Sequence, residues 1–112
     1  MTAQIEFRGK SGAAYRYSDL QSGRLLPGTA GNFVFVRDAP DGAVLLYAGE
    51  TNDLLTGMDA GWSDAVSRHG ATHRLMRLNV SSQIRRAEQE DLVSAHNPPM
   101  NPPGGVLHTA AG

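Results

Sequence analysis

Apolar and polar residues alternate along two short stretches near the start of the chain, residues 5–9 and 14–20. This period of two is typical of β-strands, and the Gly-Lys-Ser-Gly sequence between the stretches predicts an antiparallel hairpin. Residues 32–36 and 43–48 are richer in β-branched and aromatic residues, and the segment 37–42 between them contains a proline and an Asp-Gly pair. These features predict a second β-hairpin.

Helix signals follow the second hairpin. Asn52 or Asp53 can cap a short helix that glycines interrupt within two turns. Ser63 can cap another short helix, which Gly70 would end in the left-handed conformation. The pattern therefore predicts two short helical segments in place of one long helix.

Strand character returns over residues 72–80. Met76, Leu78 and Val80 are spaced by two, so they share one face of this strand. The order of elements predicts an α+β domain in which a small antiparallel sheet is flanked by helices.

A longer helix is predicted after this strand. Ser81 or Ser82 can cap it, and it runs to about His96, where an Asn-Pro-Pro sequence stops it. We expect residues 1–30 to form the N-terminal hairpin and a linker within the same domain. Residues 31–103 then form its main part, and residues 104–112 form a flexible tail.

The composition fits one soluble domain of 112 residues, with 40% hydrophobic residues and a net charge of −1. No apolar run is long enough to cross a membrane. The absence of cysteine excludes disulfides, cysteine-zinc sites and thiol catalysis. Because the first residues lack the layout of a signal peptide, we expect a cytoplasmic protein.

Charge is distributed unevenly along the chain. Residues 38–64 contain six acids and no Lys or Arg, whereas residues 68–86 contain five arginines and no acid. An anionic partner would be repelled by the first segment and attracted by the second, unless both are ordinary solvated surface. The candidate contacts to nucleic-acid phosphates are His73, Arg74, Arg85 and Arg86.

Two sequences resemble the halves of the GIY-YIG signature: "GNFVFV" at residues 31–36 and "LYAGET" at residues 46–51. A helix, a strand and a helix follow, and "NPPMN" at residues 97–101 closes the pattern. Residues 31–101 as a whole are similar to a GIY-YIG nuclease domain. The resemblance implies a three-stranded antiparallel sheet that cuts phosphodiester bonds with one divalent metal, Mg²⁺ or Mn²⁺. It also implies a site of two tyrosines, an arginine that holds the phosphate and a glutamate that holds the metal.

The catalytic positions of the family are only partly present. Tyr47 matches the tyrosine of the second half, but Phe33 stands at the tyrosine of the first half and Gly57 stands where the arginine is expected. Asn101 matches an asparagine that ties down the C-terminal segment in the family. Loss of one charge-stabilising donor typically lowers the rate by about 10²–10³, so the resemblance implies a degenerate site with little hydrolysis.

The glutamate position is ambiguous. The count from the C-terminal motif places it at Gln89, which lies between Glu88 and Glu90. Helical periodicity from Ile84 to Leu92 instead places Glu88 on the inward face, where a carboxylate needs a metal or an arginine as partner. The periodicity therefore favours Glu88 as the metal ligand.

Three hypotheses follow from these residues. The first is a degenerate GIY-YIG-type domain without nuclease activity that binds nucleic acid or a protein. The second is an active metal-dependent endonuclease in which a distant residue, such as Arg37 or Arg68, replaces the missing arginine. The third is an interaction module whose hairpin edge, residues 14–20, pairs with another chain.

Overall fold

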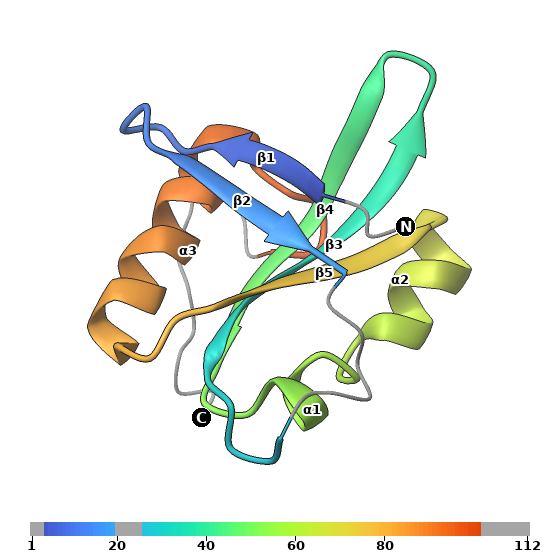
Figure 1. Ribbon diagram of the computed structural model, residues 1–112. Coiled ribbons are helices and arrows are strands. Elements are labelled where there is room, and N and C mark those ends of the chain that lie inside the picture. Colours follow the sequence, from blue (N-terminus) through green and yellow to red (C-terminus); the bar gives the residue numbers. More distant parts are fainter. Residues whose placement is uncertain (1–3, 20–25, 102–112) are drawn as a thin grey trace.

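The protein is described by a computed structural model that covers residues 4–19 and 26–101 (Figure 1). Its five strands form one antiparallel sheet in the order β1-β2-β5-β3-β4. The strands are β1 (Gln4–Arg8), β2 (Ala14–Ser18), β3 (Gly31–Ala39), β4 (Gly42–Thr51) and β5 (His73–Leu78). The helices are α1 (Leu54–Gly57), α2 (Trp62–His69) and α3 (Ser82–His96). The predicted α+β class and both predicted hairpins are confirmed, whereas the expected tail at 104–112 lies outside the described residues.

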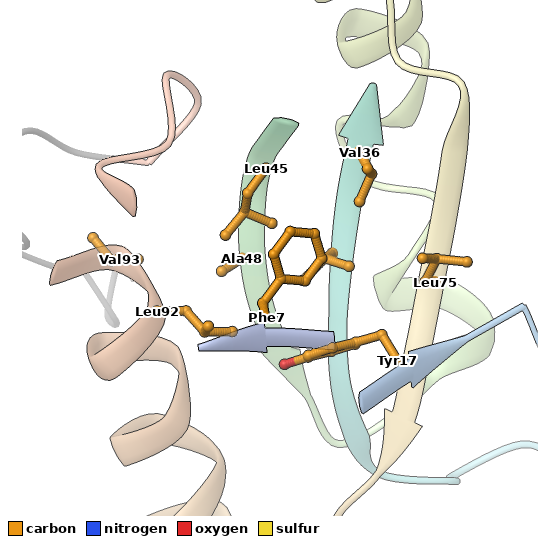
Figure 2. Close-up of a cluster of buried hydrophobic side chains, with 9 residues drawn as sticks. Phe7, Tyr17, Val36, Leu45, Ala48, Leu75, Leu92 and Val93 are labelled. Atoms are coloured by element: carbon orange, nitrogen blue, oxygen red, sulfur yellow. The ribbon is translucent and has the colours of Figure 1, made fainter. Parts of the chain in front are cut away.

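The sheet is strongly curled, because the β1–β2 hairpin joins the remaining strands at one point. Ser18 of β2 pairs with Met76 of β5, and beyond this pair the hairpin crosses over the sheet beside α3 (Figure 1). Phe7 and Tyr17 of the hairpin point into a core that α3 also lines (Figure 2). We call this the α3-side core; its buried members are Phe7, Tyr17, Val34, Val36, Leu45, Ala48, Leu75, Leu92 and Val93.

The opposite face of the sheet packs on α1 and α2. We call this second cluster the α1/α2-side core; its buried members are Phe33, Phe35, Leu46, Leu54, Met58, Ala65, Ala71 and Met76. Tyr47 and Trp62 are partly buried against it. Since alternate residues of a strand face opposite sides, β3 supplies both cores: Val34 belongs to the first, and Phe35 belongs to the second.

A β-bulge in β4 interrupts this alternation. Phe35 pairs with Tyr47, but Val36 pairs with Leu45, so β4 has one extra residue between these pairs, Leu46. Leu46 and Tyr47 consequently face the same side of the sheet, the α1/α2 side, whereas Leu45 faces α3. The pair with Phe35 fixes the face of Tyr47, and the extra residue lets Leu45, the partner of Val36, face α3.

The helix ends mostly follow the predicted capping residues. The Asp53 side chain caps α1 at Leu55 N, and Ser81 caps α3 at Ile84 N. Gly70 ends α2 in the left-handed conformation. The prediction of Ser63 as a cap is wrong: α2 begins at Trp62, two residues earlier than that cap implies. Its N-cap is Gly61, which adopts a positive φ of 82° that favours glycine.

The face predicted for the fifth strand is also only partly buried. Met76 is buried, but Leu78 is 57% exposed and Val80 is 88% exposed. The strand ends at Leu78, so Val80 belongs to the connection that leads into α3. These two side chains are therefore largely exposed in the described chain.

Each edge of the sheet is capped by the C-terminal part of the chain. At the β4 edge, the Asn101 amide accepts from Ala48 N at 2.9 Å and donates to Ala48 O at 3.0 Å, and Met100 N donates to Leu46 O. At the β1 edge, His96 Nε2 lies 2.8 Å from the Arg8 carbonyl oxygen. In the described chain, β2 lies between β1 and β5 in the strand order, and its one paired residue toward β5 is Ser18.

Candidate functional site

Tyr47 projects from the strand that follows the bulge and packs within an aromatic cluster. Its ring centroid lies 5.8 Å from that of Phe33 and 5.6 Å from that of Phe35. Burial of the ring, assisted by the charge of Glu50, raises the pKa of the Tyr47 hydroxyl. The phenol therefore stays protonated at neutral pH, which does not suit a group that must activate an attacking oxygen.

Phe33, which stands at the position expected for the first-half tyrosine, is a packing residue. It is 5% exposed and lies directly against the backbone of Gly49, where a Cβ would overlap the Phe33 ring. The close approach of the Phe33 ring to the backbone therefore requires a glycine at residue 49. The ring at residue 33 supplies no hydroxyl.

Gly57 stands at the end of α1, against the side chain of Thr51. A Cβ at Gly57 would lie 2.6 Å from Thr51 Oγ1 and 2.7 Å from Thr51 Cβ. Thr51 is itself fixed, because its hydroxyl accepts from Asp53 N at 3.0 Å. The structure therefore has no room for a larger side chain at the expected arginine position.

Glu88 is buried on the α3 side of the sheet, in the interior position that helical periodicity indicates. It is 3% exposed, and its carboxylate accepts a hydrogen bond of 2.5 Å from the Tyr17 hydroxyl. Arg77 Nε lies 3.1 Å from Oε1 and 3.0 Å from Oε2. Both carboxylate oxygens are thus engaged by protein groups, and an arginine meets the expected need for a cationic partner.

The neighbours of Glu88 take different positions. Gln89 is also buried, and its amide donates to the carbonyl oxygen of Ala48 at 3.0 Å. Glu90 is exposed. Of the three candidates, Gln89 is the one that contacts the Tyr47-Ala48-Gly49 triplet, and an amide is a poor substitute for a metal-binding carboxylate.

Tyr47 and Glu88 lie on opposite faces of the sheet. Tyr47 packs against the α1/α2-side core, whereas Glu88 bonds to Tyr17 of the α3-side core. Arg77 lies on the same face as Glu88, since it is two residues from Leu75 along β5. A substrate phosphate could not contact the Tyr47 phenol and the Glu88 carboxylate together.

The candidate phosphate contacts are divided between the two ends of β5. His73 and Arg74 lie at its start, whereas Arg85 and Arg86 lie in the first turns of α3, beyond its end (Figure 1). The structure therefore does not bring the four predicted contacts together in one patch.

The acidic and basic segments of the sequence pair with each other. Arg74 and Arg85 contact carboxylates of the acidic segment at 2.9 Å each. Arg68 contacts Asp64, which lies in the same helix, also at 2.9 Å. The His73 ring lies 3.5 Å from a carboxylate of the same segment. The pairs are Asp38–His73, Glu50–Arg85, Asp59–Arg74 and Asp64–Arg68. The charge asymmetry of the sequence is thus largely neutralised within the fold.

Two tyrosines of the first hairpin form contacts that the sequence analysis missed. Tyr15 donates to Asp91 at 2.7 Å, as Tyr17 does to Glu88. Hydrogen bonds from Ser11 and from Tyr15 hold the pKa of Asp91 below its usual range. The sequence did contain a signal for these contacts. Tyr15 and Tyr17 are two apart on a strand and so share a face, and Glu88 and Asp91 are three apart on one face of a helix.

Neither a metal cluster nor a membrane span is found in the described residues. No group of three or more His, Cys, Asp or Glu side chains there is arranged to hold a metal ion. No helix of residues 4–19 and 26–101 is long and apolar enough to cross a membrane. No family model, curated protein or solved structure matches the chain.

Proposed function

We propose that the chain is a degenerate GIY-YIG-like domain that acts by binding and not by hydrolysis. The observation that carries this proposal is the separation of Tyr47 and Glu88 by the sheet. Metal-dependent cleavage requires the nucleophile-activating group and the metal ligand to converge on one phosphate. The loss of the arginine and of one tyrosine hydroxyl, at Gly57 and Phe33, adds to this argument.

Incubation with supercoiled plasmid tests the absence of cleavage. The wild-type chain and Tyr47→Phe are compared in Mg²⁺ and in Mn²⁺, beside a reaction without protein. We expect equal and negligible nicking by the wild-type chain, by Tyr47→Phe and in the reaction without protein. Metal-dependent nicking that Tyr47→Phe abolishes would contradict the proposal and support the active alternative. In that case Arg37→Ala would be tested first as the relocated arginine, because Arg68 is already paired with Asp64 at 2.9 Å.

A protein is better supported than nucleic acid as the binding partner. Four basic side chains of the segment 68–86 are already paired with carboxylates, which weakens any attraction for a polyanion. The connection from β5 into α3 instead exposes apolar side chains: Leu78, Val80 and Ile84. Exposed apolar residues of this size are a more usual mark of protein contact.

A salt titration with fluorescently labelled single- and double-stranded DNA separates the two partner classes. We expect weak binding to either form, with a shallow dependence on salt that corresponds to about one phosphate contact. Affinity that falls steeply with salt, and that is lost in Arg74→Ala, would favour nucleic acid instead. This outcome would leave the absence of cleavage untouched, since the plasmid assay measures cleavage separately.

A further inference from the structure

A polar hollow of about 380 Å³ lies between the end of β4 and the first turns of α3. It is separate from the Tyr47 cluster and from the buried Glu88. Every residue that lines it is polar or charged: Glu50, Thr51, Asn52, Ser82, Arg85 and Arg86. Such a lining favours a charged ligand over an apolar one.

Arg85 forms the inner wall of this hollow. It is 5% exposed; Nε donates to Glu50 at 2.9 Å, and Nη1 donates to the carbonyl oxygens of Asn79 and Val80. No described residue accepts a hydrogen bond from Nη2. Because no buried side-chain nitrogen or oxygen of the described residues lacks a partner, Nη2 is not fully buried, and Arg85 lines the hollow. A nearly buried guanidinium thus presents its remaining donors to this space.

Three more donors surround the same space. The side chains of Asn52, Ser82 and Arg86 are exposed and make no hydrogen bond or ion pair with a described residue. Glu50 is the one carboxylate in the lining, and Arg85 Nε already pairs with it at 2.9 Å. Two arginines and one carboxylate leave the hollow with a net charge of +1, which favours an anion.

We propose that this hollow binds a single phosphate group, supplied as inorganic phosphate or as a phosphate monoester. Guanidinium groups form short, charge-assisted hydrogen bonds with phosphate oxygens, and amide and hydroxyl donors complete the shell. Nη2 of Arg85 is held in place by the other bonds of its side chain, so one donor is preorganised. The proposal does not depend on the protein-binding role, because it uses neither the exposed apolar side chains nor the paired arginines of β5.

The test is a titration of the ¹⁵N-labelled full chain with sodium phosphate, followed by the shifts of its backbone amides. Sodium chloride at equal ionic strength serves as the reference. We expect saturable shifts confined to Asn52, Ser82 and Arg86 and their neighbours. Arg86→Ala should weaken binding about tenfold or more, as loss of a charged hydrogen bond does. Arg16→Ala removes an exposed arginine on β2 and should leave the affinity unchanged.

The same titration with a 5′-mononucleotide and with a short single-stranded oligonucleotide distinguishes the sources of the phosphate. Similar affinities per molecule indicate a site for one phosphate group. The oligonucleotide could instead bind more than tenfold more tightly than the mononucleotide, with this affinity lost in Arg86→Ala. That result would show that the hollow is part of a nucleic-acid surface and would overturn the proposal of a site for one phosphate group. Shifts that sodium chloride reproduces, or Arg86→Ala binding equal to wild type, would also overturn it.

Discussion

The Tyr47 phenol and the Glu88 carboxylate lie on opposite faces of the same sheet, because Tyr47 pairs with Phe35 of β3, which faces the α1/α2 side. Up to Leu45 the strand alternates regularly, and that residue faces α3. The bulge then places Leu46 on the α1/α2 side together with Tyr47, the partner of Phe35. A tyrosine in the orientation of Leu45 would have faced the helix that carries Glu88. The pairing of β3 with β4 therefore separates the Tyr47 side chain from the acid.

Alkaline pH should destabilise the protein through Tyr17. Burial, followed by the charge of Glu88 and the hydrogen bond to it, strongly raises the pKa of the Tyr17 hydroxyl. A raised folded-state pKa contributes stability that is complete below the unfolded pKa of about 10 and is lost as pH rises above it. We expect the free energy of unfolding in urea to fall steeply above pH 10.

Tyr17→Phe tests the origin of this alkaline loss. At pH 7 the variant should be less stable by about 1–3 kcal/mol, because the buried Glu88 loses a donor. Above pH 10 its stability should fall less steeply than that of wild type. Tyr15→Phe is the control, since Tyr15 is more exposed and bonds to the outer Asp91. Identical alkaline slopes for wild type and Tyr17→Phe would show that another group is responsible.

Gln89→Glu should not restore a working acid. The Gln89 amide donates to Ala48 O at 3.0 Å, so a carboxylate there would face a carbonyl oxygen without a proton between them. This contact raises the pKa of the new acid and favours its protonated form. The variant should be less stable than wild type at pH 7, and the difference should shrink as pH falls, because the protonated acid can donate.

Urea unfolding between pH 4 and pH 8 measures this effect. Glu90→Gln, the reverse exchange at the exposed neighbouring position, is the control and should change stability by less than about 0.5 kcal/mol. A Gln89→Glu variant as stable as wild type at pH 7 would mean that the side chain at this position points elsewhere.

Gly57→Arg should destabilise the fold without creating activity. The new Cβ would lie 2.6 Å from Thr51 Oγ1, so the end of α1 must move or Thr51 must give up its bond with Asp53 N. Overpacking of this kind costs about 1–3 kcal/mol. Thr56→Arg adds the same side chain at the exposed preceding position of α1 and should cost far less. Equal melting temperatures for the two variants would contradict the contact with Thr51.

Asn101→Ala should loosen the β4 edge. The Ala48 N–H would lose its acceptor, whereas the Ala48 carbonyl would keep its bond from Gln89. One buried donor left without a partner costs about 1–3 kcal/mol. Hydrogen exchange of the Ala48 amide should accelerate more than that of Leu75 in the central strand β5. Unchanged exchange at Ala48 would show that the segment after α3 is not held by Asn101.

The strands and most helix ends could be predicted from short-range sequence patterns. Alternation identified both hairpins, and capping residues such as Asp53 and Ser81 act within one turn of their own position. Ser63 failed as a cap because Gly61 can adopt the left-handed conformation that starts α2 earlier. The spacing of Met76 and Leu78 gives their common face of the strand but not how far that face is covered: Met76 is buried, whereas Leu78 is 57% exposed.

The arrangement of the site depended on long-range pairing that residue spacing does not encode. The bulge at Leu46 is visible only when β4 is aligned with β3. The partners of Glu88 come from β2 and β5, so neither Tyr17 nor Arg77 could be assigned to it from helical periodicity. The periodicity placed Glu88 in the interior. Which residues contact the acid depends on the strands that pack against α3, and helical periodicity does not identify them.

The separation of Tyr47 and Glu88 is tested most directly by soaking a crystal of the protein in Mn²⁺ and locating manganese by anomalous difference density. We predict that Glu88 remains bonded to Tyr17 and Arg77, that no manganese peak lies on its carboxylate, and that Tyr47 stays on the α1/α2 side of the sheet. A manganese ion bound to Glu88, with the Tyr47 hydroxyl facing the same ion, would contradict the account.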